Sequence, residues 1–102
     1  MKKLFISQPM RDKTDEEILA VRYEAIRAAK KYLGEEVEVI DSFFQGVMHV
    51  GNKGLYLLGK SLELMSAADV VYFAKDWEKY RGCVLEQQAA LAYGLEILYE
   101  VE

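Results

Sequence analysis

The chain has 102 residues, of which 52% are hydrophobic and one is proline, so it suits one globular domain with a single modest core. Its net charge is −4 and its acidic and basic residues are interspersed, so it offers no basic stripe for a nucleic-acid polymer, although a single nucleotide remains compatible with it. One cysteine excludes an internal disulfide and one histidine excludes the usual zinc ligand sets, so we expect neither a structural metal nor a cofactor.

Strands and helices are predicted to alternate in the order βαβαβαβ, with a loop at Ser42–Asn52. The predicted strands are Lys3–Ser7, Val37–Asp41, Asp69–Ala74 and Leu95–Val101. The predicted helices are Thr14–Leu33, which opens on a capping box and stops at Gly34, a helix with apolar residues at Leu55, Leu58, Leu62 and Met65, and Cys83–Tyr93. The alternation predicts a single flavodoxin-like, three-layer α/β domain whose parallel sheet has the strand order 2-1-3-4 and helices on both faces.

No apolar run reaches the length of a membrane span, and the first residues lack the apolar region and cleavage site of a signal peptide. We therefore expect one cytoplasmic domain over residues 1–102, with no membrane partner.

The first loop at the carboxyl edge of the predicted sheet follows strand one. In this strand order the topological switch lies between strands one and three, where ligands of open α/β folds bind. The loop offers hydroxyl, amide, backbone N–H and guanidinium groups that suit phosphate or sugar oxygens. These candidate substrate-binding residues are Ser7, Gln8, Pro9, Met10 and Arg11. The alternative is that Arg11, Asp12 and Lys13 form a solvated turn.

The second loop at that edge follows strand three and runs from Lys75 to Gly82. Asp76 offers hydrogen bonds, Trp77 and Tyr80 offer stacking surfaces for a flat ring, and Arg81 offers a cation. The alternative for Trp77 is a lid over the core.

Glu86 is the residue with a reactive group at the start of the third predicted helix. At roughly 100° per residue it projects with Ala89, Ala90 and Tyr93 of the same helix. Burial there is expected to raise its pKa, while a position in the first turn favours the ionised form through the helix dipole. An ionised, poorly hydrated carboxylate is a competent nucleophile. The alternative is that Glu86 only complements the dipole or pairs with Arg81.

Two further side chains have structural interpretations that we favour. Cys83 follows Gly82 at the helix entry and reads as a small buried residue rather than a thiolate paired with His49. Arg22 falls inside the apolar stripe of the first helix, where it is expected to snorkel or to pair with a carboxylate such as Asp41.

Four motifs occur in an order and spacing that resemble the nucleoside 2-deoxyribosyltransferase-like superfamily, and within it a small, often phage-associated group. They are Ser7-Gln8-Pro9-Met10-Arg11, Leu64–Val71, Arg81-Gly82-Cys83-Val84-Leu85-Glu86 and Ala92-Tyr93-Gly94. The resemblance covers nearly the whole chain. It departs from the family pattern at Phe5, where relatives commonly have tyrosine, and at Tyr80, where they often have aspartate or serine.

The resemblance implies cleavage or exchange of the N-glycosidic bond between a base and deoxyribose. Glu86 aligns with the glutamate that attacks the anomeric carbon, and a second base or water then resolves the glycosyl ester. Asp76 is the acid that we expect to protonate the departing base. Relatives are homo-oligomers, and the apolar circumference of the third helix likewise favours at least a dimer.

Two other functions remain open at this point. In the first, the chain is a non-catalytic nucleotide or nucleotide-derivative binding module, and Glu86 contacts a ribose hydroxyl. In the second, it is a flavodoxin-like interaction domain that uses Trp77, Tyr80 and Arg81 to bind a protein partner.

Overall fold

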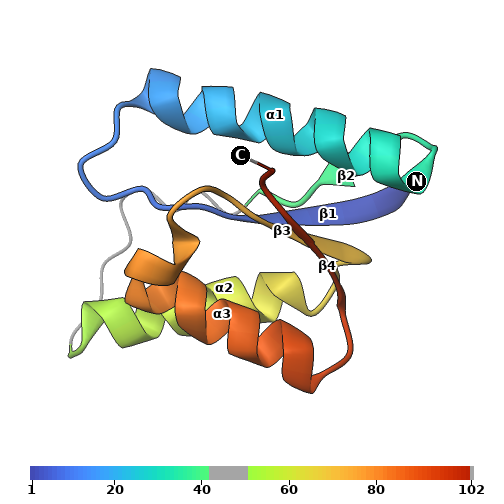
Figure 1. The fold of residues 1–102 in the computed structure, drawn as a ribbon. Coiled ribbons are helices and arrows are strands. Elements are labelled where there is room, and N and C mark those ends of the chain that lie inside the picture. Colours follow the sequence, from blue (N-terminus) through green and yellow to red (C-terminus); the bar gives the residue numbers. More distant parts are fainter. Residues whose placement is uncertain (42–50, 102) are drawn as a thin grey trace.

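The computed structural model describes residues 1–41 and 51–101, which form a central sheet with helices on both faces (Figure 1). The strands are β1 (Lys2–Ser7), β2 (Val37–Val39), β3 (Val70–Phe73) and β4 (Glu96–Tyr99). The helices are α1 (Asp15–Leu33), α2 (Lys53–Met65) and α3 (Arg81–Ala92), and a short 3₁₀ helix, η1 (Trp77–Lys79), precedes α3. All strands pair in parallel in the order β2-β1-β3-β4. The predicted fold class and strand order are therefore confirmed.

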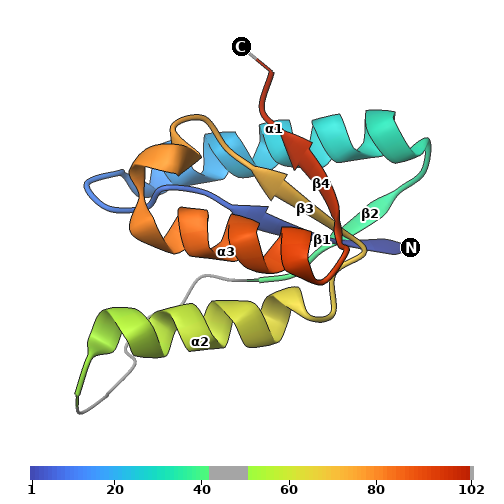
Figure 2. The same ribbon diagram turned by 60° about the horizontal axis from the view of Figure 1, so that its bottom comes forward.

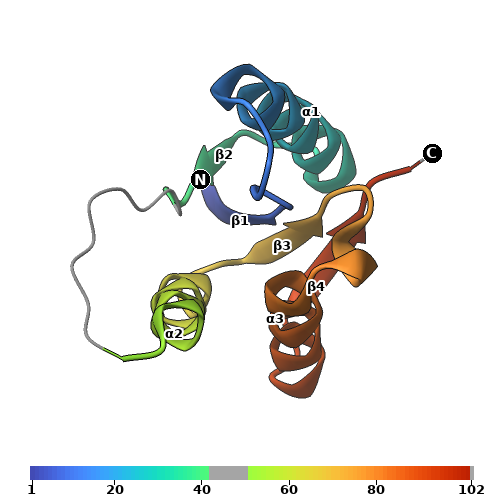
Figure 3. The same cartoon turned by 90° about the vertical axis from the view of Figure 1, so that its left-hand side faces the viewer.

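The sheet has one helix on one face and two on the other. Figures 1 and 3 show α1 alone on one side, and α2 beside α3 on the opposite side. Leu4 and Ile6 of β1 belong to the core beneath α1, whereas Phe5 belongs to the core with Met65 of α2 and Ala90 of α3. Because successive residues of a strand point to opposite faces, Ser7 continues the side of Phe5 and the next residue returns to the side of α1.

Local signals fix both ends of α1. The Thr14 Oγ1 accepts a 3.1 Å hydrogen bond from the Glu17 N–H, and the Glu17 carboxylate accepts one of 3.1 Å from the Thr14 N–H. Gly34 follows the helix in the left-handed conformation, with a φ of 70°, and its N–H donates to the Lys30 carbonyl. The helix predicted from the capping box and this glycine is confirmed.

Some predicted boundaries are wrong by a few residues. β2 ends at Val39 rather than Asp41, since it is an edge strand that pairs only with β1. α3 begins at Arg81 rather than Cys83, so Glu86 lies in the second turn, where the helix dipole supports a negative charge less. Tyr93 follows the helix with 85% of its surface exposed, so it does not help to bury Glu86.

Arg22 is confirmed in its structural role, because its guanidinium lies 3.9 Å from the Asp41 carboxylate with only 26% of the side chain exposed. Most of the predicted loop Ser42–Asn52, including His49, lies outside the described residues. None of the helices in the described part of the chain has the length and apolar character that a membrane crossing requires.

Candidate functional site

Glu86 is buried at the carboxyl edge of the sheet and is held by a hydroxyl. Its side chain is on the inner face of α3, with 8% of the residue exposed. Ser7, the last residue of β1, donates a 2.7 Å hydrogen bond from Oγ to Glu86 Oε1. Strand alternation places this hydroxyl on the α2/α3 face, so the fold brings together two predicted site residues that are 79 positions apart. Glu86 forms no ion pair with Arg81.

The environment of Glu86 shifts its acidity. Burial raises the pKa of the Glu86 carboxyl above its ordinary value, while hydrogen bonds from Ser7 and Ser61 act in the opposite direction by stabilising the carboxylate. The predicted rise in pKa on burial is therefore present. In its ionised form the Glu86 carboxylate is poorly hydrated and has specific donors to orient it.

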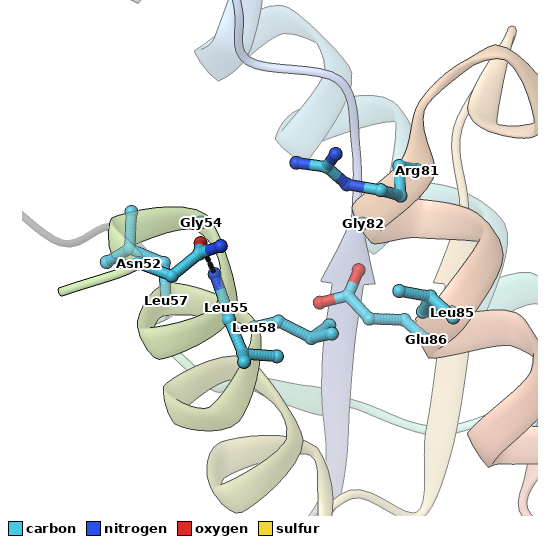
Figure 4. Close-up of a pocket in the computed structure, with 9 residues that line it drawn as sticks. All are labelled: Asn52, Gly54, Leu55, Leu57, Leu58, Arg81, Gly82, Leu85 and Glu86. Atoms are coloured by element: carbon cyan, nitrogen blue, oxygen red, sulfur yellow. Dashed lines mark hydrogen bonds between the residues drawn. The ribbon is translucent and has the colours of Figure 1, made fainter.

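Glu86 lines a pocket of about 480 Å³ between the N-terminal ends of α2 and α3. Figure 2 shows the start of α3 beside the carboxyl ends of β1 and β3, the edge at which open α/β sheets bind ligands, and the start of α2 at the same end of the molecule. The opposite wall consists of Leu55, Leu57 and Leu58 of α2. In Figure 4 the Glu86 carboxylate points into the space between the two helices. The pocket thus combines one buried carboxylate with a largely apolar wall.

Arg81 lies at the mouth of this pocket, at the start of α3 (Figure 4). Its guanidinium reaches towards α2, since a Cβ added at Gly54 would lie 3.4 Å from Arg81 Nη2. None of the ion pairs among the described residues involves Arg81. An anionic group of a ligand would therefore meet an unpaired cation here.

Gly82 leaves the space near Glu86 open. It lies four residues before Glu86, hence one turn away on the same helix face, and both residues line the pocket. A Cβ at Gly82 would meet nothing within 4 Å, and the residue does not have the positive φ that favours glycine. Neither packing nor backbone conformation requires glycine at this position, so a substitution here can test the pocket without disturbing the fold.

Asp76 does not share the pocket of Glu86, which corrects the expectation that it protonates a base bound there. Together with Gln8, Pro9 and Tyr80, it lines a second pocket of about 210 Å³ on the side of α1. Gln8 turns to that side by strand alternation, and Asp76 follows β3 in the left-handed conformation, with a φ of 67° and its carboxylate 3.3 Å from Lys79 Nζ.

Trp77 packs on the core instead of facing either of these two pockets. Its ring centroid lies 5.4 Å from that of Phe73 and 5.6 Å from that of Tyr99. The alternative role as a lid is therefore correct. Met10 and the exposed Arg11 line neither pocket. Arg11 lies in a solvated turn, which is the alternative role considered for it in the sequence analysis.

Cys83 is a buried free thiol at the entry of α3. Burial raises its pKa to about 11, so the thiolate that a nucleophile requires is disfavoured at neutral pH. Its structural interpretation is confirmed.

Sequence reasoning missed the α2 wall of the pocket. Leu55 and Leu58 served only as apolar residues at helical spacing that predict this helix, yet Leu55 is 66% exposed and both line the pocket. The sequence contains one signal for this wall of the pocket. The two helices that border the pocket begin in the same way, with a cation followed by glycine, Lys53-Gly54 in α2 and Arg81-Gly82 in α3. Over residues 1–41 and 51–101, no three His, Cys, Asp or Glu side chains gather as a metal site would require.

The fold and the pocket together define a doubly wound, flavodoxin-like α/β domain with a ligand-sized pocket at the carboxyl edge of its sheet. Comparison of the chain with protein-family models, with curated proteins and with solved structures gave no match. The chemistry of the pocket is therefore the basis for assigning a function.

Proposed function

We propose that this protein cleaves or transfers the N-glycosidic bond of a (deoxy)nucleoside or nucleotide, with Glu86 as the nucleophile. The observation that carries the proposal is the 2.7 Å hydrogen bond from Ser7 Oγ to the buried Glu86 carboxylate beside an open pocket. A nucleophile needs a defined orientation and poor hydration, and the site provides both. Ser7 also supplies a hydroxyl at the end of the strand in which Phe5 replaces the tyrosine of the resembled family.

The reaction is a double displacement at the anomeric carbon. A Glu86 carboxylate oxygen forms a bond to that carbon as the carbon–nitrogen bond breaks, and the bonding electron pair leaves with the base. Among the described residues that line the pocket, Glu86 alone is a carboxylic acid, so the departing base takes its proton from solvent. A second base, or water, then displaces Glu86 from the glycosyl ester and loses a proton, which regenerates the carboxylate.

The leucines of α2 provide a surface for the flat base. Leu58 is half-buried and reaches towards Glu86 across the pocket (Figure 4), so a heteroaromatic ring gains apolar contact there without an edge-specific hydrogen bond. Arg81 at the mouth suits a 5′-phosphate where the substrate carries one.

A non-catalytic binding module is the second candidate function. The observation that favours it is the separation of Asp76 from Glu86, which leaves no described side-chain acid to protonate the leaving base. In that function the Glu86 carboxylate accepts hydrogen bonds from ribose hydroxyls.

A substrate panel separates the two functions. The protein is incubated with deoxynucleosides and deoxynucleoside 5′-monophosphates, with and without a free acceptor base, and released base is measured by chromatography. Base release from at least one compound supports the enzyme. Saturable binding of the same compounds without release supports the binding module.

Gly82→Ala tests whether this pocket is the site, with Gly59→Ala as the matched control. Both glycines are helical, and a Cβ at either meets nothing within 4 Å, but Gly59 lines none of the pockets described here. Alanine favours a helix over glycine by up to about 1 kcal/mol, so neither variant should lower the melting temperature. The methyl group at position 82 occupies ligand space, and such overpacking costs about 1–3 kcal/mol.

We therefore expect Gly82→Ala to lower kcat/KM for base release at least about fivefold, while Gly59→Ala leaves it unchanged. Thermal unfolding and initial rates measure the two effects. Normal turnover by a stably folded Gly82→Ala protein would place the substrate elsewhere.

A further inference from the structure

The second pocket, on the α1 side of the sheet edge, is a separate cavity with its own polar lining. Its volume is about 210 Å³, and its apolar wall includes Ile18 and Val21 of α1. Residues that are adjacent in the sequence contribute to different pockets. Ser7 donates a hydrogen bond to Glu86, whereas Gln8 lines the second pocket. Likewise, Arg81 lines the first pocket and Tyr80 lines the second. The Glu86 chemistry makes no use of this cavity.

Gln8 presents a fixed hydrogen-bond acceptor to this pocket. The residue is only 7% exposed, and its Nε2 donates a 3.2 Å hydrogen bond to the Ile18 carbonyl. This bond determines which end of the amide is nitrogen and so fixes the position of Oε1. No hydrogen bond to Oε1 forms within the described part of the chain. No fully buried side-chain oxygen or nitrogen among the described residues lacks a partner, so Gln8 Oε1 is partly exposed. Because Gln8 lines the second pocket, this oxygen is the acceptor that the residue can offer to a ligand there.

Charges of both signs line the pocket, the lysines Lys13 and Lys75 and the carboxylates Glu17, Asp76 and Glu100. Hydrogen bonds from Thr14 and, to a smaller extent, the charge of Lys13 lower the pKa of Glu17. Lys13 and Lys75 belong to none of the ion pairs of the described residues. Glu100 is half-buried, its N–H donates to the Phe73 carbonyl at 2.9 Å, and its carboxylate is 3.5 Å from the Tyr72 hydroxyl. The pocket thus has two lysines outside these close ion pairs, three carboxylates of which Glu100 is half-buried, and an oriented amide oxygen.

We propose that this pocket is a second small-molecule site that binds a zwitterion of amino-acid size, a free α-amino acid with a small apolar side chain. The ammonium group is hydrogen-bonded by Gln8 Oε1 and Glu100, and the carboxylate group lies against Lys13 and Lys75. The apolar side chain packs on the α1 wall. A phosphate ester is disfavoured because Glu17, Asp76 and Glu100 also line the cavity, and the volume is less than half of the 480 Å³ beside Glu86.

Titration calorimetry on the intact protein tests this site with defined probes. The probes are glycine, alanine, valine and serine, the amines that lack their carboxylates, and the carboxylic acids that lack their ammonium groups. We expect at least one amino acid to bind at least tenfold more tightly than either of its singly charged analogues.

Four variants locate the binding. Lys75→Met and Glu100→Gln should each weaken binding at least tenfold. Lys31→Met and Glu35→Gln make the same charge changes at exposed positions outside the pocket and should leave it unchanged. Binding should persist in Glu86→Gln, so the result does not depend on the proposed reaction. No heat with any amino acid, amine binding equal to amino-acid binding, or equal losses in pocket and control variants would each overturn the proposal.

Discussion

Glu86→Gln is expected to abolish base release, with a loss in kcat of at least about a thousandfold, because the amide cannot form the glycosyl ester. Glutamine keeps the shape of the side chain and an acceptor for the Ser7 hydroxyl, so the 2.7 Å contact and the α3 packing have no reason to change. Glu78→Gln is the matched control, since it removes an exposed carboxylate from η1 and should leave the rate unaltered.

The same variant should gain stability at neutral pH. Burial raises the pKa of Glu86 in the folded state above its unfolded value, so the fold favours the neutral carboxyl. The contribution of the neutral Glu86 carboxyl to the free energy of unfolding is fully present below the pKa that Glu86 has in the unfolded chain. It is lost as pH rises through the pKa that Glu86 has in the folded protein. Each unit of pKa difference corresponds to about 1.4 kcal/mol.

Melting temperatures of wild type and Glu86→Gln between pH 4 and pH 8 measure this effect. The advantage of the variant should be absent at the acid end and grow with pH, to about 4–8 °C for each kcal/mol in a domain of this size. A variant that keeps near-normal turnover rules out the covalent mechanism. A variant that is less stable than wild type at neutral pH assigns Glu86 a structural role.

Ser7→Ala is expected to have the second-largest effect. It removes the hydroxyl that donates to Glu86 Oε1, and a hydrogen bond to a charged group contributes about 1.5–3 kcal/mol. The rate of base release at neutral pH should therefore fall about 10–100-fold. Because this hydrogen bond acts to lower the pKa of Glu86, the pKa should rise further in the variant.

The dependence of the rate on pH distinguishes this role from simple damage to the fold. The reaction needs the Glu86 carboxylate, so the rate rises with pH through its pKa, and that rise should move to higher pH in Ser7→Ala. Ser61→Ala should shift it in the same direction by less, because its hydrogen bond has the smaller influence on the pKa. Ser66→Ala, whose hydroxyl donates to the Glu63 carbonyl, should not shift it. If the pH profile of Ser7→Ala does not shift, the Ser7 hydroxyl does not influence the ionisation of the nucleophile Glu86.

Much of the fold could be predicted because short-range rules determine it. The capping box at Thr14 and the glycine at position 34 mark the ends of α1 by local hydrogen bonds and backbone conformation. Alternation of strands and helices then leaves few topologies for a parallel sheet, and the order 2-1-3-4 is the one observed. The edge that carries Ser7 and Glu86 follows from this order.

The composition of the pocket could not be predicted in the same way. Side chains of two loops at one sheet edge can point to either face of the sheet. Gln8 lies on the α1 side because of strand alternation, and Asp76 lines the same pocket from a left-handed backbone conformation. Exposed Leu55 also follows the helical spacing of a core residue, because the apolar stripe of α2 continues beyond the part that α3 and the sheet cover. Periodicity identifies apolar positions but not what covers them.

The stereochemistry of transfer tests the central claim, that Glu86 acts through a covalent glycosyl ester, most directly. A β-deoxynucleoside or its 5′-monophosphate is incubated with the protein and methanol as acceptor, and the methyl deoxyriboside is examined by NMR at early times. Two successive displacements predict the β-methyl product, with formation lost in Glu86→Gln. An α-methyl product would mean direct attack by the acceptor, and the absence of base release from any compound would mean that the pocket only binds; either result contradicts Glu86 as nucleophile.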